Sequence, residues 1–191
     1  MLPIAPLMIE HRLIEKMIRL MAQETARIRE NVTVSPRFAF LDVKFIDAAV
    51  DFIRTYADQV HHSKEEDILF AALEKKSLSP EHLKVMQELY QDHEWGRKTT
   101  ARLVEAQGKF MQGSSEPLTD IIGCLAALVE FYPRHIAKED QQFFLPSMEY
   151  FSQEEKNAIL AKMVEFDRGF IQGKYQKIVA DWESGGCKCH L

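Results

Sequence analysis

The chain has few cysteines and no long apolar run, and these shortages exclude whole classes of protein. Three cysteines in 191 residues, Cys124, Cys187 and Cys189, are too few for a disulfide-stabilised scaffold. No apolar stretch reaches the roughly 18–20 residues that cross a bilayer. The first residues lack the charged segment and cleavage site of a secretion signal. We therefore expect a soluble, cytoplasmic protein that makes no membrane contact.

Several binding and catalytic signatures are also missing. The net charge is −5 and the basic residues form no patch, which argues against nucleic acid as a partner. The sequence contains no phosphate-binding loop, no dinucleotide fingerprint and no nucleophile triad. The Glu-x-x-His pairing of ferritin-type bundles is absent too. The chemistry has to be sought in other residues.

Sustained two-residue alternation is absent, so strands are not expected. Between four clusters of turn residues, apolar residues at helical spacing predict five helices, over 4–30, 40–76, 80–110, 117–146 and 152–183. Short connections between long helices favour antiparallel neighbours. The predicted fold is all-α, an up-down-up-down four-helix bundle with an additional C-terminal helix. We expect the bundle over 1–150, the accessory helix packing on it over 151–184, and a flexible Cys/His tail over 185–191.

The most informative feature is a pair of His-x-x-Lys-Glu segments, at 61–65 and 135–139, each in an expected helix. The i, i+4 spacing places the histidine and the glutamate on one helix face, one turn apart. His11 and His93 lie in the two other helices, each directly after an acidic residue. A helix with a lone histidine followed by a His-x-x-Lys-Glu helix thus occurs twice, as a weak internal repeat.

The apolar faces of the helices decide which of these residues point inward. His11, His93 and His135 each continue an apolar line of their helix. The second helix offers two pairs with the i, i+4 spacing, at 61 and 65 and at 62 and 66. The line through His61 and Glu65 is apolar, whereas the line through His62 and Glu66 is polar. We expect the latter pair to be solvated or to contact the ligands from outside.

A carboxylate buried without a partner costs several kcal/mol, so buried glutamates need cations or hydrogen-bond donors. Four imidazoles and two carboxylates suit a pair of first-row transition metals and favour iron. The alternative is an internal network of hydrogen-bonded His–Glu pairs without metal. The predicted metal ligands are His11, His61, Glu65, His93, His135 and Glu139.

Four segments in this order, 8–15, 56–70, 92–97 and 132–146, resemble the hemerythrin-like, HHE cation-binding family. The resemblance implies a non-haem di-iron centre, with two iron ions and a bridging oxo or hydroxo group. The four histidines would be terminal ligands, and Glu65 and Glu139 would bridge the irons. Relatives bind dioxygen reversibly, sense oxygen or iron, or repair damaged iron centres.

Two positions depart from the oxygen-carrying members of the family. Those members place a second histidine one turn after the third-helix histidine, and here that position is Arg97, whose cationic side chain cannot bind a metal. They also bridge with an aspartate five residues after the last histidine, which here is Asp140. A water, Glu94, Asp140 or a tyrosine completes the site, or one iron keeps an additional open position.

Three functions are compatible with such a centre. The first is a protein that binds dioxygen, nitric oxide or peroxide for sensing, storage or iron and oxygen homeostasis. The second is an enzyme that reduces peroxide or nitric oxide. The third is an iron-centre repair or interaction module with a structural metal site. Aromatic residues near the site, among them Tyr56, Phe131, Tyr132 and Phe143, either exclude water from it or are ordinary core residues.

The C-terminal part offers two further predictions. Apolar residues of the last helix either pack across the bundle or form a homodimer, and these are Ile159, Met163, Phe166 and Phe170. In the tail, Cys187, Cys189 and His190 could bind zinc or copper, act as a redox pair, or be part of a flexible end. Cys124 lies among apolar residues and is expected to be buried.

Overall fold

The computed structural model describes residues 1–34, 41–114, 117–168 and 172–184. All regular structure in these ranges is helical, which confirms the predicted all-α class. The elements are α1 (Ala5–Val34), α2 (Val43–Asp51), η2 (Phe52–His62), η3 (Lys64–Phe70), α3 (Ala71–Leu73), α4 (Pro80–Met111), α5 (Pro117–Lys138), η4 (Glu139–Phe143), α6 (Phe144–Ser147), η5 (Met148–Tyr150), α7 (Gln153–Asp167) and α8 (Gln172–Glu183).

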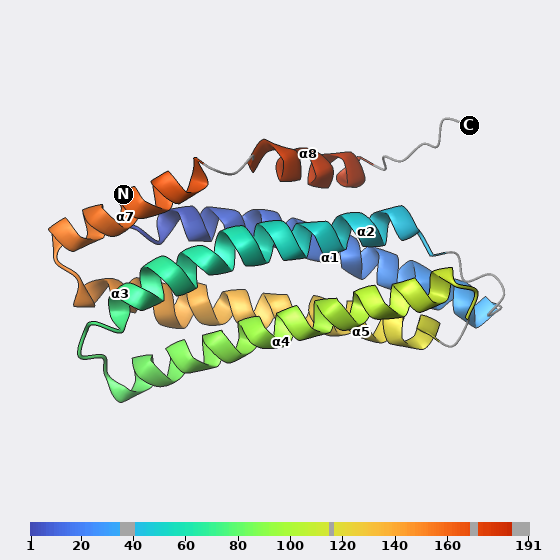
Figure 1. The fold of residues 1–191 in the computed structure, drawn as a ribbon, viewed down its shortest axis with the longest axis horizontal. Coiled ribbons are helices and arrows are strands. Elements are labelled where there is room, and N and C mark those ends of the chain that lie inside the picture. Colours follow the sequence, from blue (N-terminus) through green and yellow to red (C-terminus); the bar gives the residue numbers. More distant parts are fainter. Residues whose placement is uncertain (35–40, 115–116, 169–171, 185–191) are drawn as a thin grey trace.

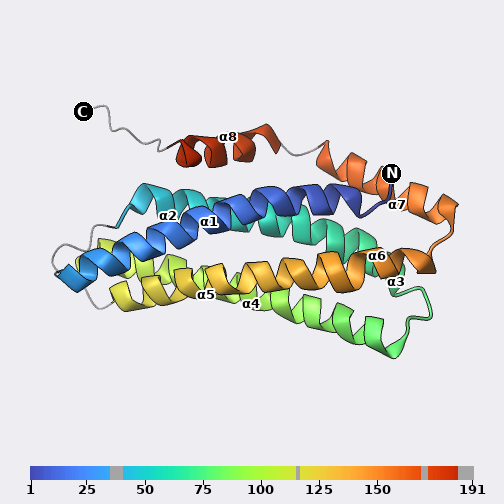
Figure 2. The ribbon, with the colours of Figure 1, turned by 180° about the vertical axis from the view of Figure 1, so that it is seen from behind.

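Four long rods run side by side with alternating direction, as predicted (Figures 1 and 2). The first rod is α1, the second is α2 to α3, the third is α4, and the fourth runs from α5 to α6. Side chains cap the starts of two helices. Ser79 accepts a hydrogen bond from the backbone of His82 and precedes Pro80, and Ser152 forms a capping box with Glu155.

Parts of the second and fourth rods are wound as π-helix, with i→i+5 hydrogen bonds, in the segments η2, η3 and η4. Such winding is rare and is often found at functional sites. A π-helix turns less per residue than an α-helix, so adjacent side chains diverge less around the axis. In η2 this brings His61 and His62 toward the same side of the rod.

The interior consists of two apolar clusters separated by a polar layer. One cluster includes Ile14, Ala57, Leu128 and Tyr132, and the other includes Leu7, Leu69, Leu89, Phe143 and Phe144. The predicted ligands lie along the rods between these two sets. The bundle therefore holds its histidines and glutamates in one layer across the core.

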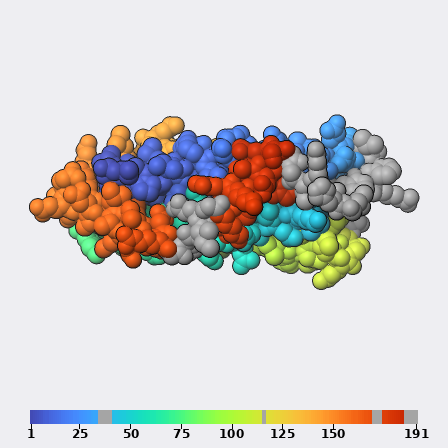
Figure 3. Space-filling model, turned by 90° about the horizontal axis from the view of Figure 1, so that it is seen from above, coloured from blue at the N-terminus to red at the C-terminus, as the bar shows by residue number. Residues whose placement is uncertain are grey.

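The C-terminal part contains two helices, α7 and α8, where we predicted a single one over 152–183. Both lie along the side of the bundle formed by α1 and the second rod (Figure 3). Ile159 and Met163 of α7 are buried in one apolar cluster, and Tyr175 and Val179 of α8 in the other. The described part of the last segment thus packs within the monomer. Phe170 and the Cys187/Cys189/His190 group lie outside the described residues.

Within the described ranges, the helices lack the combination of length and apolar character that a bilayer crossing requires. Cys124 is buried and unbonded, as expected for a small apolar residue. Burial raises the pKa of its thiol. It is far less reactive than an exposed cysteine would be.

Candidate metal centre

All six predicted ligands are buried in the polar layer and come from four rods. His11, Glu65, His93 and Glu139 are 0% exposed, His61 is 1% exposed and His135 is 2% exposed. The ligand atoms of His11, His61, Glu65 and Glu139 lie within 4.8 Å of one another, close enough to hold a metal ion. The sequence therefore identified side chains that the fold brings together.

Each glutamate directs its two oxygens toward different histidines. Glu65 places Oε1 3.2 Å from Nε2 of His61 and Oε2 3.3 Å from Nε2 of His93. Glu139 places Oε2 3.2 Å from Nε2 of His11 and Oε1 3.2 Å from Nε2 of His135. Both carboxylates thus lie between the His11/His61 pair and the His93/His135 pair, the orientation that bridging carboxylates require.

These inward-facing atoms have no proper hydrogen bonds. Eight buried side-chain atoms lack a partner with hydrogen-bond geometry among the described residues: Nε2 of His11, His61, His93 and His135, and both oxygens of Glu65 and Glu139. Buried polar atoms without a partner are rare in folded proteins and cost roughly 1–3 kcal/mol each. Two cations within this ring of nitrogens and oxygens would satisfy all eight.

The opposite nitrogen of each imidazole is held by a carboxylate from another rod. The Nδ1–H of His11 donates to Asp140 at 2.8 Å, and that of His61 donates to Glu10 at 3.0 Å. His93 donates to Glu66 at 2.7 Å, and His135 donates to Asp92 at 3.3 Å. A carboxylate on Nδ1 leaves the lone pair on Nε2, which orients it for a metal.

A cation lies behind each of these outer carboxylates. Lys64 pairs with Glu10, Arg12 with Asp140, Arg97 with Glu66 and Lys138 with Asp92. The outer charges are therefore paired within the protein. With neutral imidazoles, the two inner carboxylates are left without a cation, which is the charge that bound metal would neutralise.

The internal repeat explains this pattern of contacts. The acidic residue before each lone histidine holds the histidine of the following helix, as Glu10 does for His61 and Asp92 for His135. The lysine of each His-x-x-Lys-Glu segment then pairs with that same acidic residue. The residue after each inner glutamate holds the lone histidine of the other half of the repeat. The two halves therefore complete each other's sites.

The site also perturbs the pKa values of its own groups. Burial acts to lower the pKa of His61, but the charge of Glu65 and the hydrogen bond to Glu10 outweigh it and raise the pKa to about 10. Burial acts to raise the pKa of Glu65, but the charges of His61 and His93 hold it well below the usual 4.5. Without metal, protons on the imidazoles would balance the carboxylates.

A family model of the hemerythrin HHE cation-binding domain matches residues 2–145. The chain belongs to this family. The resemblance expected from the four sequence segments is thereby confirmed. The comparison with curated proteins gives no match, and neither does the comparison with solved structures.

His62 is buried in the polar layer, where we had not placed it. It is 3% exposed, so the expectation that it is solvated is wrong. Its ring stacks on that of His93, with centroids 3.9 Å apart and planes 12° apart. The solvated alternative is wrong because it assumed α-helical rotation between residues, whereas η2 is π-helical. The other alternative, contact with a predicted ligand, agrees with the stack on His93. The aspartate one turn earlier, Asp58, was the available signal, since it contacts Nδ1 of His62 at 3.3 Å.

Glu66 fulfils the other part of that expectation, because it contacts the ligand His93 from outside the layer. Asp140 has both oxygens engaged outside as well, Oδ1 with His11 and Oδ2 with Arg12. Glu139 is therefore the inward-facing carboxylate of the pair. The geometry agrees with the four-residue spacing rather than with the five-residue spacing of the oxygen carriers.

Arg97 occupies the position of the missing family histidine, and neither it nor any residue considered as a replacement has both the position and the protonation state of a metal ligand. Arg97 is 40% exposed at its side chain and pairs with Asp58 and Glu66. Glu94 is 61% exposed and pairs with Lys98, so it does not reach the layer. Burial raises the pKa of both Tyr56 and Tyr132, which disfavours a phenolate ligand.

Proposed function

We propose that this chain holds two iron ions in a non-haem di-iron centre and binds a small molecule such as dioxygen there. The ligands would be His11, His61, Glu65, His93, His135 and Glu139, with both glutamates bridging. This would serve oxygen sensing, oxygen storage or iron homeostasis. The observation that supports it most directly is the ring of eight buried nitrogen and oxygen atoms without hydrogen-bond partners.

The donor set fits iron rather than a softer metal. It combines imidazole nitrogens and carboxylate oxygens, and it contains no thiolate among the described residues. Carboxylates stabilise the higher oxidation state, and imidazoles keep the ferrous state accessible. Bound ferrous iron would supply the electrons and the open coordination position that dioxygen, nitric oxide or peroxide requires.

The protein's own residues would hold the imidazoles and exclude bulk water. Aromatic rings stack on three of the histidines: Phe144 on His11, Phe70 on His93 and Phe131 on His135, with centroids 5.7, 6.2 and 5.2 Å apart. Phe70 and Phe144 are fully buried. A dry surrounding of this kind limits loss of electrons to solvent.

The test is metal stoichiometry and optical response of the full chain. We expect the wild-type protein to bind two ferrous ions per chain under anaerobic conditions. Admission of dioxygen should then produce a colour change and near-ultraviolet charge-transfer absorption. Binding of fewer than two ions would refute the dinuclear centre, and two ions without any optical change would refute dioxygen binding.

Matched variants distinguish the role of the polar layer from that of surface carboxylates. Glu65→Gln and Glu139→Gln keep the side-chain volume but remove the bridging charge, so each should weaken iron binding by about tenfold or more. Glu94→Gln is the control, because Glu94 lies on the solvent side of α4. Equal affinity in all three variants would contradict the assignment. Continuous consumption of peroxide or nitric oxide by the iron-loaded protein would instead support the enzyme alternative.

A further inference from the structure

The internal repeat is broken at one position of the polar layer. A shift of 74 residues superposes the second-rod site residues on those of the fourth rod, so that His61, Lys64, Glu65 and Glu66 correspond to His135, Lys138, Glu139 and Asp140. Under the same shift His62 corresponds to Ile136. Both residues are buried, at 3% and 4% exposure. One half of the layer therefore carries an imidazole where the other half carries an apolar side chain.

His62 shares two structural features with the four predicted ligands, burial and a carboxylate on Nδ1. It is buried in the same layer, and its Nδ1 is held by a carboxylate, that of Asp58. That carboxylate pairs in turn with a cation, because Arg97 Nε lies 2.7 Å from it. The order imidazole, carboxylate, cation is the one that holds His11, His61, His93 and His135. Because Asp58 satisfies Nδ1, the other ring nitrogen of His62, Nε2, is the atom left to contact an ion.

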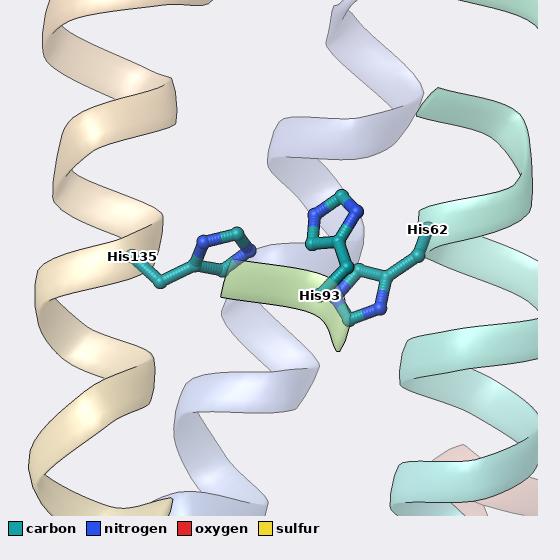
Figure 4. Close-up of side chains that lie close together, drawn as sticks. All are labelled: His62, His93 and His135. Atoms are coloured by element: carbon teal, nitrogen blue, oxygen red, sulfur yellow. The ribbon is translucent and has the colours of Figure 1, made fainter. Parts of the chain in front are cut away.

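The position of His62 also indicates which of the two proposed ions it would contact. One ring nitrogen each from His62, His93 and His135 lies within 4.8 Å of the others, and these residues form a second cluster able to hold an ion. Figure 4 shows the three rings meeting from η2, α4 and α5. Oxygens of Glu65 and Glu139 also lie 3.3 and 3.2 Å from Nε2 of His93 and His135.

We propose that His62 is a seventh metal-binding residue, which provides a third imidazole for the ion between His93 and His135. This rests on the proposed dinuclear centre and makes it asymmetric, with three imidazoles at one ion and two at the other. The additional histidine comes from the second rod, whereas the third-rod position used by oxygen-carrying relatives is Arg97.

The variant His62→Ile tests this by giving the first half of the repeat the residue of the second half. We expect the metal-free variant to fold, and one of its two iron sites to weaken by about tenfold or more in competition with a chelator. X-ray absorption should show five imidazoles shared by two ions in the wild-type protein and four in the variant. Ile136→Leu, in the corresponding position, is the packing control and should keep both affinities.

Added imidazole provides a second and independent measurement. A pocket of about 390 Å³ reaches His62 from the surface and is also lined by Asp58, Arg97 and Tyr132. In His62→Ala, free imidazole should enter through this pocket and restore the weakened site, and it should change nothing in His62→Ile, where the apolar side chain fills the space.

Two outcomes distinguish failure of this inference from failure of the proposed function. Wild-type affinity and an unchanged imidazole count in His62→Ile would show that His62 only packs against His93. A wild-type protein that binds fewer than two ions would refute the dinuclear centre itself. Lack of rescue by imidazole in His62→Ala, with the site still weakened, would also overturn direct ligation.

Discussion

Replacement of Lys64 by methionine is the sharpest test of how the polar layer is held together. Lys64 is 0% exposed, and its ammonium group contacts the carboxylates of Glu10 and Asp167. Glu10 in turn holds Nδ1 of His61, so one buried lysine connects the polar layer to the end of α7. Methionine preserves the length and apolar stem of lysine but removes the charge.

The expected loss follows from the burial of the partner. Glu10 is 4% exposed at its side chain, so Lys64→Met removes one of the two cationic partners, Lys64 and His61, of a buried carboxylate. Breaking such a pair costs about 3–5 kcal/mol. In a protein of this size each kcal/mol lowers Tm by roughly 2–4 °C, so we expect a decrease of roughly 6–20 °C.

Thermal unfolding of the metal-free protein, followed by circular dichroism or calorimetry, measures this effect. Lys98→Met is the matched control, since Lys98 is 70% exposed at its side chain and pairs with Glu94 on the surface. It should change stability by no more than about 0.5 kcal/mol. The double variant Lys64→Met/Glu10→Gln should regain part of the stability, because the uncompensated charge is gone. A loss below about 1 kcal/mol in Lys64→Met would refute a buried, essential ion pair.

Two further predictions concern the outer carboxylates and pH. Asp92→Asn should weaken metal binding by about 10–100-fold in chelator competition, because Asp92 orients His135, and an unchanged affinity would contradict that role. In the metal-free protein, the raised pKa of His61 stabilises the fold fully below pH 6.5, an effect lost as pH rises through about 10. The lowered pKa of Glu65 stabilises it above pH 4.5, an effect lost as pH falls. Burial lowers the pKa of His62 to about 3, so the neutral form of His62 stabilises the fold above pH 6.5, an effect lost as pH falls. Urea midpoints should therefore be highest near pH 6.5, and a maximum above pH 8 would disagree with the ion pairing of His61.

The sequence by itself determined the helices and the inward-facing histidines and glutamates of the polar layer. Apolar spacing marked the rods, and the same spacing placed His11, His93 and His135 on core-facing lines, because a helix of known pitch converts position into direction. The repeated His-x-x-Lys-Glu segments located both inner glutamates. The acidic residues next to the lone histidines were visible as well, although their partners were not.

Only the tertiary structure decided which residues of different rods contact one another. Glu10 holds His61 and Asp140 holds His11 across 51 and 129 residues of sequence, distances over which local periodicity carries no information. The inward position of His62 depends on the π-winding of η2, which a pattern based on α-helical pitch cannot detect. Only the packing shows that α7 and α8 cover different apolar clusters of the bundle.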